Sequence, residues 1–110
     1  NRAASGINKI TAVEKVPLLT INEIIKNNFR TYPDLLSIDI EGYELKVLKS
    51  LEFDKYPIPV ICAETCTYSE NHIRKKDPTL IDFLSSKDYE VYADTYINTI
   101  FVYKKWFYTI

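Results

Sequence analysis

The sequence predicts an α/β fold with a mostly parallel sheet and an antiparallel hairpin at its C-terminal end. Apolar runs of strand length alternate with stretches of helical periodicity, and the chain closes with two strand-like runs near enough to pair. Size supports the same class, because 110 residues with 46% hydrophobic and 14% aromatic side chains can form one domain with a modest core.

The first part of the chain is predicted to contain a short strand and a helix. Residues 13–19 have strand character, although Pro17 restricts them to a sheet edge or a strand end. A helix is predicted over 21–29, because Thr20 and Glu23 have the spacing of a capping box and apolar residues recur on one helical face.

Two strands in the middle of the chain are predicted to lie inside a covered sheet. Residues 35–40 and 59–64 are nearly continuous apolar runs, which is typical of parallel strands that are buried on both faces. Gly42 marks a turn after the first run, and the leucines of 43–51 follow it with helical spacing.

The last part of the chain begins with a polar loop over 65–77. Asp77 is expected to cap a third helix, with Pro78 at its first position. The runs 89–94 and 99–104 are separated by a short turn and predict an antiparallel hairpin.

Composition and charge narrow the function classes. The net charge is −1 with both signs mixed along the chain, which argues against nucleic acid or an anionic membrane surface as a partner. No apolar run approaches the ~20 residues of a membrane-spanning helix. Cys62 and Cys66 are interpreted as reduced thiols, so a cytoplasmic location is predicted.

Acidic residues follow both central strands at the point where each ends. Asp39 and Glu41 close the first run, Glu64 closes the second, and Glu44 lies where the following helix begins. Ligands of parallel α/β sheets bind at the carboxyl ends of the strands, so these acids are candidate site residues. Asp39 and Glu41 are two residues apart and would point the same way in an extended strand. Glu41 and Glu44 have a structural alternative, which is to complement the helix N-terminus.

The carboxylates are compatible with two chemistries. They could bind a divalent metal ion, which prefers oxygen ligands, or one could act as a base and orient a substrate hydroxyl or amine. Tyr68 and His72 lie in the long polar loop, where a substrate-binding lid would lie, although a lone surface histidine is the simpler interpretation for His72. Spacing alone leaves these alternatives open.

The segment "PDLLSIDIEGYELKVLKSL" resembles the signature of the FkbM family of S-adenosylmethionine-dependent methyltransferases. The pattern there is an apolar strand, then Asp-x-Glu-Gly-x-Glu, then a helix, and Asp39, Glu41, Gly42 and Glu44 match it. "VPLLTINEII", "PVICAET" and "YEVYADTYINTIFVYKK" are similar to the segments that precede and follow this signature. The resemblance covers most of the chain.

This resemblance implies a Rossmann-like methyltransferase fold, of which residues 1–110 would be a single partial domain, the C-terminal half, with 1–12 flexible. Strand 35–40 would be the fourth strand, 59–64 the fifth, and the hairpin the sixth and seventh, with the seventh inserted between the fifth and sixth. The first three strands and their glycine-rich loop have no counterpart, and no Gly-x-Gly occurs, so no cofactor-binding residue is assigned. The edge of strand 35–40 is therefore expected to pair with the missing N-terminal half, a second copy, or a covering segment of the chain's own first residues.

The family resemblance also implies the activity: methyl transfer from S-adenosylmethionine, typically to an oxygen of a small molecule or sugar. The residues assigned by it are catalytic Asp39 and Glu41, substrate-binding Glu64, Tyr68 and His72, and structural Gly42 and Glu44, with no metal ligand. Two alternatives remain: a metal-dependent hydrolase or phosphodiesterase that uses the strand-end carboxylates, and a non-enzymatic half-domain that pairs with a partner.

Overall fold

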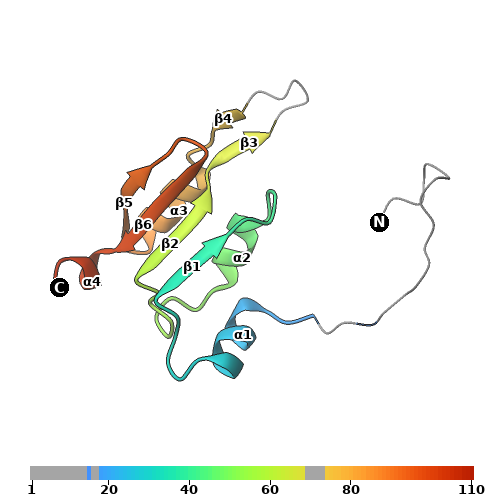
Figure 1. The fold of residues 1–110 in the computed structure, drawn as a ribbon, viewed down its shortest axis with the longest axis vertical. Helices are drawn as coiled ribbons and strands as arrows, with labels where there is room; N and C mark the ends of the chain where they lie inside the picture. The colour runs from blue at the N-terminus through green and yellow to red at the C-terminus, as the bar shows by residue number, and fades with distance from the viewer. Residues whose placement is uncertain (1–14, 16–17, 69–73) are drawn as a thin grey trace.

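The computed structural model describes residues 15, 18–68 and 74–110, and in them it shows a mixed α/β fold (Figure 1). The strands form a four-stranded sheet in the order β1-β2-β6-β5 and a separate two-stranded ribbon, β3-β4. The elements are α1 (Ile21–Asn28), β1 (Leu35–Ile38), α2 (Glu44–Ser50), β2 (Val60–Glu64), β3 (Cys66–Tyr68), β4 (Arg74–Lys76), α3 (Thr79–Ser86), β5 (Tyr89–Asp94), β6 (Asn98–Tyr103) and α4 (Lys104–Phe107).

The strand order agrees with the one that the family resemblance implies. β1 and β2 are parallel, with Leu35 opposite Val60, and β6 is antiparallel to both β2 and β5. The last strand is thus inserted between β2 and β5, as expected for the seventh strand. The predicted hairpin is confirmed, with an irregularity in register between Val91 and Ala93.

Several element boundaries differ from the predictions. β1 ends at Ile38, so Asp39 lies outside the strand in which it was expected. Residues 66–68 and 74–76 form the β3-β4 ribbon inside the segment that was predicted to be a loop. The predicted flexible segment 1–12 and most of the predicted strand 13–19 lie outside the described residues.

The predicted capping box of α1 is confirmed. Glu23 N donates a hydrogen bond to Thr20 Oγ1 at 3.2 Å, and Thr20 N donates to Glu23 Oε1 at 2.9 Å. Hydrogen bonds to the Glu23 carboxylate from the Thr20 backbone N–H and from the Thr20 side chain hold the pKa of Glu23 below its usual value. Asn22 connects α1 to the end of α2, because its side chain donates to the Ser50 carbonyl at 2.7 Å and accepts from Glu52 N at 2.9 Å.

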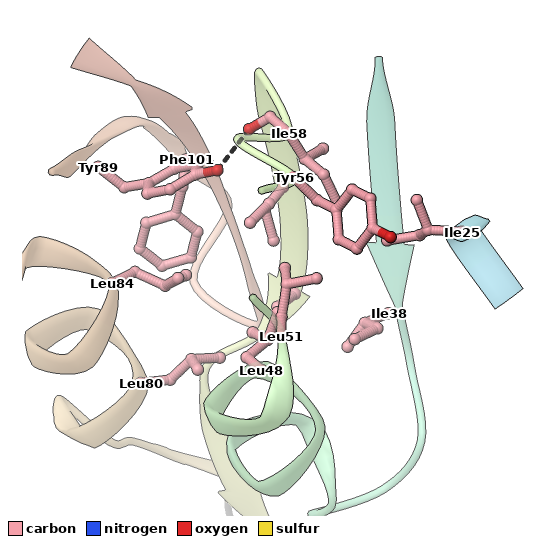
Figure 2. Packing of buried hydrophobic residues seen from close by; sticks show 12 residues of the cluster. Ile25, Ile38, Leu48, Leu51, Tyr56, Ile58, Leu80, Leu84, Tyr89 and Phe101 are labelled. Carbon is pink, nitrogen blue, oxygen red and sulfur yellow. Dashed lines mark hydrogen bonds between the residues drawn. The ribbon is translucent and has the colours of Figure 1, made fainter. Parts of the chain in front are cut away.

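The core lies between the sheet and helices α2 and α3, which cover one of its faces (Figure 1). Leu48, Leu84 and Ile61 are completely buried there, as Figure 2 shows for the first two. The hydroxyl of buried Tyr89 donates to the Ile58 carbonyl at 2.5 Å, so this polar atom is satisfied inside the core. Burial raises the pKa of Tyr89 far above its usual value. In the described part of the chain, no helix has the length and apolarity needed to cross a membrane.

Candidate functional site

An open cleft of about 740 Å³ lies at the edge of the sheet where β1 and β2 end. Its lining residues come from three segments: 41–45 at the turn after β1 and the start of α2, 64–67 at the end of β2 and in β3, and 77–80 at the N-terminal end of α3. The carboxyl ends of parallel strands are the usual position of a ligand site in α/β sheets. The cleft is therefore the candidate site.

A tight turn after β1 presents the first acids to the cleft. Glu41 and Gly42 both have backbone angles in the left-handed region, with φ of 47° and 96°. Glycine adopts this conformation without the steric cost that a side chain adds, which accounts for the residue type at Gly42. At Glu41 the conformation carries some strain, so an additional contact is needed to keep the turn in place.

That contact is supplied by Glu44, which is only 5% exposed. Its carboxylate accepts hydrogen bonds from Ile40 N and from Gly42 N, each at 2.9 Å. A carboxylate that accepts two backbone N–H groups forms charge-assisted bonds that are stronger than neutral ones. Glu44 therefore holds the turn on which Glu41 is carried, rather than contributing a free side chain to the cleft.

The turn separates the two acids that were expected to point the same way. Both Asp39 and Glu41 are exposed, but Glu41 lines the cleft whereas Asp39 is not among its lining residues. The expectation assumed an extended strand through Ile40, and the strand ends two residues earlier. Asp39 therefore lies after the end of β1 and not inside the predicted strand 35–40.

The second segment of the cleft follows β2. Glu64 is the last residue of this strand and is half-buried, and Thr65 after it is 3% exposed. Thr65 Oγ1 lies 2.6 Å from Thr99 Oγ1 in β6, so the two buried hydroxyls satisfy each other. Tyr68, an expected substrate-binding residue, ends β3 with its backbone opposite Arg74. His72, the other expected residue of this loop, lies outside the described residues.

The third segment brings a further carboxylate to the cleft at the start of α3. The structure places Pro78 at the cap position, so the predicted cap at Asp77 is one residue too early. Asp77 Oδ1 nevertheless accepts from Thr79 N at 3.0 Å and from Thr79 Oγ1 at 2.6 Å. These two bonds hold the pKa of Asp77 below its usual value, which favours the ionised form.

The cleft thus combines carboxylates with hydroxyl groups. Glu41, Glu64 and Asp77 come from three segments that are distant in sequence, and Thr67 and Thr79 add hydroxyls to the same lining. Such a set can orient a ligand hydroxyl or amine and accept a proton from it. Within the ranges that the structure describes, no three His, Cys, Asp or Glu side chains are grouped closely enough to hold a metal ion.

The sequence predicts the position of Glu41 and Glu64 at this edge of the sheet, but not that of the threonines or of Asp77 in the cleft. A signal for Thr65 and Thr67 was present, because polar residues directly after a central strand lie at the functional edge of the sheet. The sequence predicts Asp77 as a helix cap, and it does not reveal that this helix end faces the cleft.

The chain matches the model of a known protein family. The model described as the Methyltransferase FkbM domain matches residues 2–91. This range includes every residue that lines the cleft and ends within β5. Searches among curated proteins and among solved structures give no match.

Proposed function

The chain belongs to the FkbM methyltransferase family, and from this premise we propose that it acts in the transfer of a methyl group from S-adenosylmethionine to an oxygen atom of a small molecule or sugar. The observation that carries the proposal is that the matched range contains a cleft lined with carboxylates at the carboxyl ends of β1 and β2. The family match favours methyl transfer over metal-dependent hydrolysis by the same carboxylates.

The residues of the cleft suit the acceptor side of this reaction. Methylation of a hydroxyl oxygen releases the hydroxyl proton, and a carboxylate within hydrogen-bond reach can accept it. Glu41 is our first candidate for this base, because it lines the cleft on a turn held in place by Glu44. Asp39, on the same turn, is the second candidate.

The other polar groups of the cleft would orient the acceptor. Glu64 and Asp77 can accept hydrogen bonds from further hydroxyl groups of the ligand, and Thr67 and Thr79 line the same cleft. Tyr68 and His72, which follow Thr67 in the chain, remain proposed acceptor-binding residues. A ligand with several hydroxyl groups, such as a sugar, matches this set of acceptors.

The described residues do not fit the cofactor itself. Gly42 is the one glycine among them, and a side chain added there would meet nothing within 4 Å, so this glycine does not form a close-fitting cradle. We therefore assign no cofactor-binding residue among them. We propose that the cofactor side of the site is completed by residues other than those described, as in a Rossmann-like methyltransferase fold.

The edge of β1 is the place where such residues would attach. In the described part of the sheet β1 pairs with β2 alone, and Leu35 in this strand is 57% exposed. An apolar strand with an open edge is prone to pair with another strand. We propose that an N-terminal half of the domain, a second copy or the chain's first residues cover it. Hydrogen exchange of the β1 amides should then be slow throughout; a monomer in which alternate β1 amides exchange as fast as a loop would contradict the proposal.

The proposed activity is tested with isotopically labelled S-adenosylmethionine and the full-length natural protein. Methyl transfer is measured to a panel of monosaccharides and small alcohols, with matched amines and phosphate esters included. We expect label in an ether linkage of at least one hydroxyl compound. Transfer to amine nitrogen or to no compound of a broad panel, under conditions in which the cofactor binds, would argue against O-methylation.

A further inference from the structure

Lys76 joins several parts of the fold through its ammonium group. Its Nζ atom lies 2.7 Å from Asp94 Oδ1 and 2.7 Å from the Tyr96 carbonyl oxygen, both at the β5-β6 connection. It also lies 2.6 Å from Thr65 Oγ1 after β2 and 3.0 Å from Thr99 Oγ1 in β6. An ammonium group has three N–H donors, so these four acceptors saturate it. Lys76 is therefore engaged within the protein and is not a free cation for a ligand.

One acceptor of Lys76, Thr65, belongs to a wall of the cleft, and this wall is also bonded to the β5-β6 turn. Thr65 lines the cleft directly, and its carbonyl accepts from Asp77 N at 2.8 Å while its own N–H donates to the Ile97 carbonyl at 2.9 Å. Cys66 Sγ donates to the Tyr96 carbonyl at 3.0 Å. Thr65 and Cys66 are thus bound to the β5-β6 turn, and Asp77 is bound to Thr65. The β3-β4 ribbon projects beyond the end of the sheet beside this turn (Figure 1).

This wall has little intrinsic stability. β3 and β4 pair with each other and form no ladder with the main sheet in the described part of the chain. A two-stranded ribbon is marginally stable by itself, so its position depends on the side chains that connect it to the rest of the fold. Lys76 makes four such connections with described residues, and its side chain is 25% exposed.

We propose that Lys76 is a positioning residue: by fixing Thr65 and the β3-β4 ribbon against the β5-β6 turn, it sets which acceptors the cleft binds. This inference rests on the proposed function. Lys76 acts through the cleft wall and touches no reacting atom. Loss of its ammonium group should therefore weaken acceptor binding and selectivity more than it slows the chemical step.

The matched pair of variants is Lys76→Met and Lys75→Met in the full-length protein. Both substitutions remove one positive charge from β4. Lys75 is exposed, and its backbone carbonyl accepts a hydrogen bond from Thr67 Oγ1, which the substitution retains. In Lys76→Met, amides of 65–67 and 77 should exchange about tenfold faster or more, as expected for the loss of a charge-assisted hydrogen bond. Lys75→Met should leave these amides unchanged, and Lys76→Arg should restore much of the protection.

The second measurement is methyl transfer to the hydroxyl acceptors of the panel. We expect Lys76→Met to raise KM for the acceptor about tenfold and to change kcat little, with the order of preferred acceptors altered. Unchanged exchange in Lys76→Met, or faster exchange with an unchanged KM, would overturn the proposal. If the unaltered protein transferred no methyl group, the proposed function and the acceptor role of Lys76 would both fail, while exchange would still decide whether Lys76 fixes the wall.

A milder variant covers the case in which Lys76→Met does not fold. Asp94→Asn removes the exposed partner charge and keeps the size of the side chain. The bonds from Lys76 and from Tyr96 N hold the pKa of Asp94 below its usual value, which is consistent with a charged pair. Faster exchange confined to 65–67 and 77 in Asp94→Asn supports the proposal, and exchange equal to that of the unaltered protein overturns it.

Discussion

Replacing Glu41 with glutamine is expected to lower kcat for methyl transfer by about 10²–10⁴-fold, the usual contribution of a general base. Glutamine has nearly the same size and keeps one acceptor oxygen, but it cannot take up the proton that an acceptor hydroxyl releases. Since Glu41 is exposed at the cleft and its backbone angles are held by Glu44, the substitution should leave the free energy of unfolding nearly unchanged. Single-turnover rates with labelled S-adenosylmethionine provide the measurement.

Asp39→Asn is the variant that discriminates between the two candidate bases. Asp39 is exposed and is not among the residues that line the cleft, so we expect a smaller loss of kcat than in Glu41→Gln. Glu52→Gln is the matched control, because Glu52 is also exposed but lies after α2, bound to α1 through its backbone. A full rate in Glu41→Gln together with a large loss in Asp39→Asn would move the catalytic role to Asp39.

The fold could largely be predicted because its signals are local. Thr20 and Glu23 announce the start of α1 through a capping box, and the apolar run that ends at Glu64 specifies a central strand. The insertion of β6 between β2 and β5 is not a local signal. It was predicted from the resemblance to the family and not from periodicity.

The candidate site was predicted less well because it depends on where chains turn. The sequence shows acids after both strands, but it does not show that β1 ends at Ile38 and that Glu41 takes a left-handed conformation. That turn decides which acid lines the cleft. The pairing of Lys76 with Asp94 and Thr99 joins residues 18 and 23 positions apart, so it depends on tertiary structure that no local pattern encodes.

Replacing Glu44 with glutamine is expected to reduce the free energy of unfolding by about 2–4 kcal/mol, because hydrogen bonds to charged groups contribute about 1.5–3 kcal/mol each. Glutamine keeps one acceptor oxygen, but its NH₂ group would face one of the two N–H donors, Ile40 N or Gly42 N. That N–H donor would then have no partner, and because residue 44 is only 5% exposed, water could not easily replace the lost bond. Urea unfolding measures the loss, with exposed Glu52→Gln as the control.

The same substitution should also lower activity, since the turn that Glu44 holds carries Glu41. With one of its two bonds lost, the left-handed conformation of Glu41 is no longer fully restrained, and the carboxylate spends less time in the cleft. Glu44→Gln should therefore lower both stability and kcat, whereas Glu41→Gln should lower kcat alone. Stability equal to that of the unaltered protein in Glu44→Gln would show that the two hydrogen bonds do not hold the turn, and the assignment of Glu41 would then lose its structural basis.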